Sequence, residues 1–283
     1  MPLLSIAFAL LVLVILYVAY AARGFAAYAG DLRQRLAAAQ FDTRVEEIAP
    51  PPPLMRDFAL RNGGRPGGPG LIEVRQTAEL ATAPGKSFFP LRARQTTGTR
   101  RAGFVWTASG TMPPGIPVSG LDAYVEGAGD FEIRIGGAVR VARAHDREAA
   151  IGELARYLAE LPFYPDAILN AGGLAWRQLD ERRVEVVAES NFGPVRVVFI
   201  FDAAGDIVAI EADRPRDLGG RSVPTPWRGT FSQYRAFGSH RLPAHGEVGW
   251  LLPEGLFIYW KGDIVSYEPA DDPRGSIRSQ RLP

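Results

Sequence analysis

The most constraining feature of this chain is an uncharged apolar stretch near its start, at residues 3–22. Twelve of these residues are Leu, Ile, Val or Phe, and an insertion scale gives them about 4 to 7 kcal/mol in favour of the bilayer. A helix of this length reaches roughly 30 Å, the thickness of the hydrocarbon core. The sequence therefore predicts a transmembrane anchor over residues 1–23, followed by a tethered domain.

A cleaved signal peptide is the alternative interpretation. Ala-x-Ala sites occur at residues 19–21 and 27–29, but no Lys or Arg precedes the apolar run, which is longer than a signal peptide requires. We therefore expect an uncleaved single-pass anchor in the cell (inner) membrane. The positive-inside rule, applied to Arg23, Arg33 and Arg35, favours a cytoplasmic domain, although the bias is small.

Composition bounds the rest of the chain. Roughly 220 further residues are enough to bury a core as one β-rich unit. The formal net charge of +1 argues against nucleic acid as a partner, because nucleic-acid binding requires a concentrated basic face. The absence of Cys excludes lipoprotein anchoring through an N-terminal cysteine and is compatible with either redox compartment.

Residues 24–49 are expected to form a helical stalk followed by a polar linker, because residues 24–40 are helix formers and residues 42–47 are polar. Four prolines at residues 50–53 stop any helix. The folded domain is expected over residues 50–268, and a disordered polar tail over residues 269–283.

From residue 71 the apolar residues alternate with polar ones, the pattern of strands with one buried face. The sets expected to face the core are Ile72, Val74, Ala78 and Leu80; Phe89, Leu91 and Ala93; Phe104, Trp106 and Ala108; Leu121, Ala123 and Val125; Phe131, Ile133 and Ile135; and Val139 with Val141.

One long helix interrupts the strands, at residues 146–161, with Asp146 as its N-cap. Its apolar positions recur at helical spacing and are Ile151, Leu154, Tyr157, Leu158 and Leu161. Strands are expected again at residues 174–179, 183–190, 195–201, 206–212, 227–237, 241–251 and 256–267.

This order of elements excludes a doubly wound α/β fold, which needs helices alternating with strands. We expect a mainly β (α+β) domain, in which a curved antiparallel sheet or half-open β-barrel of about 11–12 strands wraps around the helix. A cup of this kind leaves room for an apolar ligand on its concave face.

No catalytic, metal or cofactor motif stands out, and we expect no enzyme, metal or cofactor. His240 and His245, with Glu247 as a third ligand, are one candidate metal half-site. Their spacing matches no known ligand pattern and a turn is expected between them at Pro243, so we favour surface histidines of a hairpin. His145 is the remaining histidine. The chain contains neither a cysteine nucleophile nor a Gly-x-Ser-x-Gly elbow.

Two proline-containing segments, residues 211–216 and 224–229, place arginines and a tryptophan at the ends of two expected strands. In one interpretation Arg214 and Arg228 bind an anionic head group against Trp227. In the other, which we favour, Asp213 and Arg228 form a buried ion pair that fixes a corner of the sheet.

Aromatic residues on strands are more often core than ligand site, but in a cup the core and the cavity wall are the same surface. The candidate ligand-binding residues are Trp106, Tyr124, Tyr157, Arg214, Trp227, Arg228, Tyr234 and Trp260.

Six blocks follow one another in a characteristic order. They are Gly103-Phe104-Val105-Trp106, Asp122-Ala123-Tyr124-Val125, Glu153-Leu154-Ala155-Arg156-Tyr157-Leu158, Glu211-Ala212-Asp213-Arg214-Pro215, Pro224-Thr225-Pro226-Trp227-Arg228-Gly229 and Phe231-Ser232-Gln233-Tyr234-Arg235. In this order they resemble a family of bacterial proteins without assigned activity, the DUF6544 (also DUF6920) type, over about residues 50–267. More remotely, the layout is similar to the half-barrel of the LolA/LolB lipoprotein carriers.

Three functions are compatible with this reasoning. The leading one is a membrane-tethered module whose concave face binds a lipid, an acyl chain or a lipidated partner. The alternatives are an envelope assembly or protein-interaction module with a fully packed barrel, and an enzyme on a membrane-associated substrate that uses Asp122, Tyr124, Arg214 and Arg228. The family-level architecture implies a domain outside the cytoplasm, and we expect that side.

Overall fold

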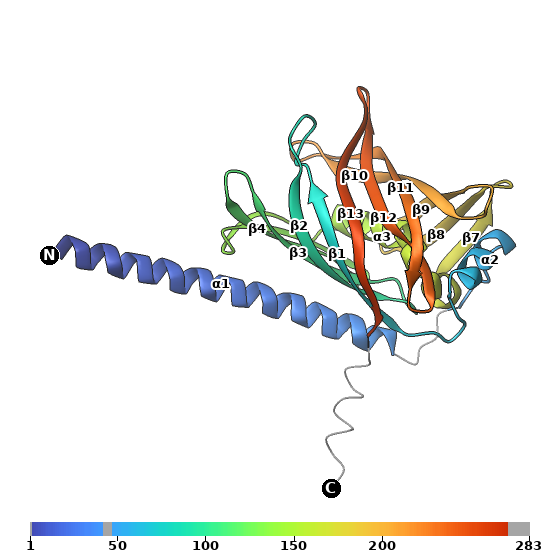
Figure 1. Cartoon of the computed structure of the whole chain (residues 1–283), viewed down its shortest axis with the longest axis horizontal. Coiled ribbons are helices and arrows are strands. Elements are labelled where there is room, and N and C mark those ends of the chain that lie inside the picture. The colour runs from blue at the N-terminus through green and yellow to red at the C-terminus, as the bar shows by residue number, and fades with distance from the viewer. Residues whose placement is uncertain (1, 42–46, 271–283) are drawn as a thin grey trace, which may run out of the picture.

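A single curled sheet of thirteen antiparallel strands dominates the structure, a computed structural model that describes residues 2–41 and 47–270 (Figure 1). The helices are α1 (Pro2–Gln40), α2 (Pro53–Arg61), α3 (Arg147–Ala159) and α4 (Pro165–Asn170), with a short 3-10 helix η1 (Leu161–Phe163). The strands are β1 (Leu71–Leu80), β2 (Phe89–Gly98), β3 (Phe104–Met112), β4 (Ile116–Val125), β5 (Ala128–Ile135), β6 (Val139–Ala144), β7 (Leu174–Gln178), β8 (Arg183–Ser190), β9 (Gly193–Phe201), β10 (Ile207–Asp217), β11 (Ser222–Phe237), β12 (His240–Leu252) and β13 (Gly255–Pro269).

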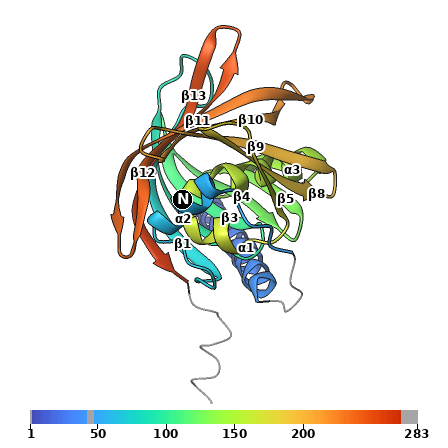
Figure 2. The same cartoon turned by 90° about the vertical axis from the view of Figure 1, so that its right-hand side faces the viewer.

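The sheet consists of two meanders. Strands β1 to β6 form one and β7 to β13 the other, and the pairing of β1 with β13 joins them in the middle. The two edge strands, β6 and β7, are connected by the segment that contains α3, and the sheet curls around this helix (Figure 2). The predicted half-open barrel around one helix is confirmed, with thirteen strands rather than 11–12.

Helix α3 begins as predicted. The side chain of Asp146 accepts a hydrogen bond of 2.9 Å from the backbone N–H of Ala149, which satisfies one of the unpaired donors of the first turn. Leu154, Tyr157 and Leu158 are fully buried in the main core, on the concave side of the sheet.

Helices α2 and α4 close one end of the cup. The Phe58 ring of α2 meets the rings of Phe201 and Tyr234 edge-on, with centroid distances of 6.0 and 6.4 Å. At the same end, Arg241 binds Asp206 through two hydrogen bonds of 2.8 and 2.7 Å. Both aromatic packing and a bidentate ion pair therefore fix this end of the domain.

The residues expected to face the core are correct for β1 to β3, but those expected for β4 are wrong. Leu121, Ala123 and Val125 belong to a second core outside the cup, whereas Asp122 lines its cavity and Tyr124 belongs to the main core inside it. Alternation alone could not distinguish the faces, because both faces of β4 are buried. The apolar row expected at Val139 and Val141 is also wrong, since β6 is an edge strand and leaves both side chains exposed.

The second core is formed by the C-terminal half of α1, which lies along the outside of the sheet (Figure 1). Its buried side chains on α1 are Ala29, Leu32, Leu36 and Ala37, and those on the sheet are Leu71, Val105, Leu121, Ala123 and Val125. Helix α1 is continuous from Pro2 to Gln40, so the expected stalk is helical but packs against the domain. The tail was expected from residue 269, but Pro269 is the last residue of β13. Residues 271–283 of this expected tail and residues 42–46 of the polar linker lie outside the described residues.

Polar contacts fix this half of α1 in register. The Tyr28 hydroxyl donates to Asp130 Oδ1 at 2.6 Å, and Arg33 Nη2 donates to Thr107 Oγ1 at 2.7 Å. At the end of the helix, Gln40 Oε1 accepts from the backbone N–H groups of Arg100 and Arg101, each at 3.0 Å. The helix and the sheet therefore form one unit.

The N-terminal half of α1 contacts little of the domain. Among the described residues, α1 is the one helix long and apolar enough to cross a membrane. Its large side chains are exposed, among them Ile6, Phe8, Leu10, Leu11, Leu13 and Ile15. Such a surface is unfavourable in water and favourable in a bilayer.

Replacing Leu36 tests the docking of α1. Leu36→Ala removes a side chain that is 1% exposed, and we expect it to lower the free energy of unfolding by about 2 to 4 kcal/mol through lost burial and the cavity left behind. The measurement is urea unfolding of the full chain, followed by tryptophan fluorescence. Leu60→Ala, at an exposed site on α2, serves as the control and is expected to change stability by less than about 0.5 kcal/mol. Equal losses in the two variants would contradict the packing.

Candidate functional site

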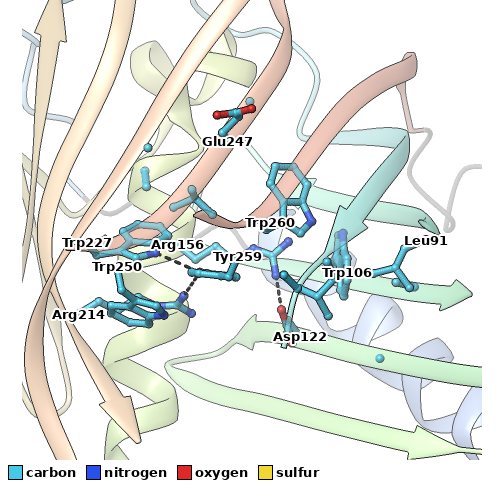
Figure 3. A pocket seen from close by; sticks show the side chains of 18 of the residues that line it. Leu91, Trp106, Asp122, Arg156, Arg214, Trp227, Glu247, Trp250, Tyr259 and Trp260 are labelled. Carbon is cyan, nitrogen blue, oxygen red and sulfur yellow. Dashed lines mark hydrogen bonds and ion pairs between the residues drawn. The ribbon is translucent and has the colours of Figure 1, made fainter. Parts of the chain in front are cut away.

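A cavity of about 610 Å³ lies between the concave face of the sheet and α3 (Figure 3). This volume is within the range of roughly 300 to 1,000 Å³ that is usual for small-molecule sites. Aliphatic and aromatic side chains from both meanders form most of the wall, among them Leu91, Trp106, Ile133, Trp227, Trp250 and Trp260. The site is therefore a largely apolar pocket.

Small residues at inward positions leave this space open. Gly120 of β4 and Ala108 of β3 line the cavity. A Cβ added at Gly120 would meet only Trp106, at 3.5 Å. Large aromatic rings form other parts of the same wall, among them Trp106, Trp227, Trp250 and Trp260.

Charged side chains meet at the wall formed by α3 and β4. Arg156 of α3 pairs with Asp122 of β4, donates from Nε to Glu160 Oε1 at 2.8 Å and donates from Nη2 to Gln95 Oε1 at 3.1 Å. The guanidinium also lies 4.9 Å from the ring centroid of Trp106. Arg156 is thus held by hydrogen bonds on both sides and by a cation–π contact.

A second buried arginine mirrors this arrangement on the other meander. Arg214 of β10 donates from Nη2 to Glu153 Oε1 at 3.1 Å and from Nε to the carbonyl of Gly152 at 2.9 Å. Its Nη1 lies 3.3 Å from the Tyr259 hydroxyl, which also accepts from Trp227 Nε1 at 3.0 Å (Figure 3). Helix α3 is therefore tied to β4 through Arg156 and to β10 through Glu153.

The protonation of this cluster is perturbed. Burial, reinforced by the neighbouring Asp122 carboxylate, raises the pKa of Glu153 to about 8. Burial also raises the pKa of Asp122, against the opposing effect of Arg156. Within the described residues, Glu153 Oε2 is buried without a hydrogen-bond partner. We therefore expect the cluster to hold Glu153 as a neutral acid near pH 7.

Four of the candidate ligand-binding residues lie at the cavity. Trp106, Arg214, Trp227 and Trp260 line it, and all four are labelled in Figure 3. The arginine among them is already engaged by the cavity wall. The three tryptophans come from β3, β11 and β13, so the strands of both meanders contribute to one apolar surface.

The other four candidates lie elsewhere. Tyr157 is buried and donates to the carbonyl of Gly98 at 3.1 Å, and Tyr124 belongs to the main core. The Tyr234 hydroxyl donates to the carbonyl of Ile207 at 2.7 Å, close to α2. Arg228 is half-exposed, so the predicted convergence of Arg214 and Arg228 on one anion does not occur.

The predicted buried ion pair between Asp213 and Arg228 is wrong. Arg228 pairs with Glu211 at 3.0 Å, because the register of β10 and β11 places these two residues directly opposite each other. The same register places Pro226 opposite Asp213. The register of a hairpin determines cross-strand partners, and it was not known from the sequence.

The histidines do not converge. His240 Nε2 lies 2.8 Å from Asp166 at the closed end, whereas His245 Nδ1 lies 2.7 Å from Asp263 on the neighbouring strand. His145 Nδ1 lies 2.9 Å from Asp130. A search of residues 2–41 and 47–270 finds no group of three or more His, Asp or Glu side chains that could hold a metal ion.

Sequence reasoning missed the charged wall of the cavity. Glu153, Arg156 and Glu160 follow one another at spacings of three and four residues, and they therefore lie on one face of α3, the spacing at which helical side chains meet. No role was predicted for this charged face from the sequence. The available signal was that the helix also has apolar residues on most of its remaining surface.

Comparison with protein families identifies one match. The model of DUF6544, a family of unknown function, matches residues 42–262. A comparison with curated proteins gives no match.

Three solved structures show distant similarity. A LolA superfamily protein from Nitrosomonas europaea is 11% identical, with a TM-score of 0.40 and coverage of 81% of this chain and 97% of that chain. An outer membrane lipoprotein-sorting protein domain from Vibrio parahaemolyticus is 14% identical, with a TM-score of 0.41 and coverage of 79% and 97%. A DUF1329 family protein from Desulfovibrio piger is 10% identical, with a TM-score of 0.43 and coverage of 78% and 94%.

The raised pKa of Glu153 predicts a pH dependence of stability. An unfolded chain ionises this side chain near pH 4.5, whereas the folded chain keeps the proton until about pH 8. The unfolded state therefore binds fewer protons in this window, and the free energy of unfolding falls as the pH rises through it. In Glu153→Gln this part of the fall is expected to be missing.

The measurement is urea unfolding of the two proteins at several pH values between about 5 and 9. Glu254→Gln, at an exposed position in the turn between β12 and β13, is the matched control and should follow the wild type. Parallel curves for Glu153→Gln and the wild type would show that Glu153 ionises normally in the folded protein.

Proposed function

This chain belongs to DUF6544, the family that its sequence blocks resemble, and because that family has no known function we propose a role from the geometry of the cavity. The protein is a membrane-anchored binding protein that holds the apolar part of a lipid, an acyl chain or a lipidated partner inside the half-barrel. The observation that carries this proposal is the unfilled cavity of about 610 Å³ with its predominantly apolar wall. Water in such a space gains few hydrogen bonds, so an apolar ligand is favoured there.

The charges of the wall support an apolar rather than an anionic ligand. Arg156 is bound by Asp122 and Glu160, and Arg214 by Glu153. Both guanidinium groups already have hydrogen-bond partners in the wall, so an incoming phosphate or carboxylate would have to displace a buried acid. The cost of leaving that acid unpaired disfavours such an exchange.

The geometry favours binding over the two alternatives. A protein-interaction module with a packed barrel would fill its interior with side chains, whereas small residues such as Ala108 and Gly120 keep this one open. An enzyme would need polar groups free to act on a substrate, whereas the charged groups that converge at this cavity are hydrogen-bonded to one another, as Arg156 is to Glu160 and Arg214 to Glu153. Of the four residues considered for catalysis, Asp122 and Arg214 line the cavity, while Tyr124 and Arg228 do not.

Brominated fatty acid provides a direct probe, because four of the five tryptophans line the cavity and α1 contains none. Added to the full chain in lipid nanodiscs, the probe should quench tryptophan fluorescence saturably. Ala108→Phe fills part of the cavity and is expected to weaken the apparent affinity at least about tenfold, or about 1.4 kcal/mol.

The matched control is Ser109→Phe, which adds the same ring to the exposed face of the same strand. It should leave quenching unchanged. Equal quenching in the two variants, or no saturable quenching in the wild type, would overturn the proposal.

We further propose that residues 3–22 of α1 span the inner membrane once and that the half-barrel lies outside the cytoplasm. The exposed apolar side chains of this segment support the span. Alkaline phosphatase fused to the C-terminus is then active, and a fluorescent protein fused there is dark. The opposite pattern would place the domain in the cytoplasm.

A further inference from the structure

We propose that the docked helix α1 holds the mouth of the cup against the bilayer surface, and that the β3–β4 and β5–β6 hairpins are the surface that contacts the lipid head groups. The partner is the membrane in which α1 is anchored. This inference rests on the proposed anchor, and it adds a fixed orientation of the cavity.

Helix α1 cannot act as a flexible tether. It is one continuous helix from Pro2 to Gln40, and its C-terminal half is buried on the sheet and fixed by the contacts of Tyr28, Arg33 and Gln40. No loop separates the proposed span from the docked half. The direction of the span therefore sets the direction of the whole domain.

The β5–β6 hairpin is the part of the domain that lies where the proposed span ends. Arg134 of β5 donates from Nη1 to the carbonyl of Ala21 at 2.7 Å, and its guanidinium lies 5.0 Å from the ring centroid of Phe25. In the turn between β5 and β6, a Cβ added at Gly137 would lie 3.8 Å from Val18 of α1. The β5–β6 hairpin thus touches α1 at the boundary of the proposed span.

The β3–β4 hairpin lies at the same level. The backbone N–H of Gly136 donates to the carbonyl of Pro117 at 2.8 Å, which ties the two hairpins together. Figure 1 shows β4 on the side of the domain nearest the N-terminal half of α1, and α2 at the opposite end. The closed end of the cup is therefore the end far from the membrane.

One strand of these hairpins exposes both apolar and basic side chains. On the edge strand β6, Val139 and Val141 are 58% and 52% exposed, and the exposed Arg140 and Arg143 come from the same strand. Exposed apolar residues combined with arginines suit the interface of a bilayer that contains anionic lipid. The edge of the sheet, which would otherwise be open to strand pairing, is covered by the membrane in this arrangement.

The cavity begins close to this surface. Val118 and Ser119 of β4 and Ile133 of β5 line the cavity and lie within a few residues of the two turns. An acyl chain that leaves the bilayer here reaches the apolar wall without crossing bulk water. The orientation therefore favours direct exchange between the membrane and the cup.

The absence of cysteine makes the test clean, because each single-cysteine variant carries one label. Val139→Cys marks the proposed membrane-facing surface, and Thr111→Cys, at an exposed position of β3, is a second such site. Ala203→Cys, in the turn beside Arg61 of α2, is the matched control at the closed end. The full chain carrying an environment-sensitive fluorophore is reconstituted into phosphatidylcholine vesicles with phosphatidylglycerol and head-group spin-labelled lipid.

We expect the spin label to quench the probes at positions 139 and 111 at least several-fold more than the probe at position 203. Vesicle flotation is measured on the same samples. A chain that floats with equal quenching at all three positions overturns the proposed orientation and leaves the anchor intact. A chain that does not float overturns the anchor itself, whereas the tryptophan-quenching assay reports on the cavity independently.

Discussion

Helix α3 is tied to both meanders by buried hydrogen bonds between arginines and acidic side chains, and the shape of the cup depends on this attachment. Arg156 pairs with Asp122 on β4, and Glu153 pairs with Arg214 on β10. The sheet has open edges at β6 and β7, and the two meanders are joined by the β1–β13 pairing and bridged on the concave side by this helix. Buried contacts between arginine and acidic side chains contribute little net stability compared with apolar packing, but they penalise every arrangement that separates the partners. Their main effect here is to fix the width of the cavity.

The outer face of the sheet obeys a second constraint. Val105, Leu121 and Ala123 would expose apolar surface on the convex side if α1 did not cover them. The same helix carries the apolar segment proposed to span the membrane. Covering the sheet and orienting the domain are therefore consequences of one packing interaction, and a change in that packing is expected to affect both stability and orientation.

Much of the fold could be predicted from the sequence because alternation and helical spacing are local properties. The strands, the N-cap at Asp146 and the long apolar helix follow from neighbouring residues alone. Which side of β4 faces the main core could not be predicted, since a strand buried on both sides has no polar face to indicate where the solvent lies.

The site was harder to predict than the fold. Three of the candidate tryptophans and Arg214 line one cavity. Their contact partners could not be predicted, because these depend on strand register and on the placement of α3. The interior position of Glu153 and Arg156 was not predicted, because charged residues normally indicate an exposed face. A charged helical face becomes interior when the opposite wall supplies a complementary charge, as β4 and β10 do here.

The most direct test of the central claim is photo-crosslinking with a fatty acid that carries a diazirine at the end of its acyl chain. The full chain is reconstituted in lipid nanodiscs, irradiated and mapped by peptide mass spectrometry. If the cavity holds acyl chains, crosslinks will fall on segments that line it, such as those around Trp106 and Trp250, in addition to the membrane-spanning part of α1. Crosslinks confined to α1 would contradict the account.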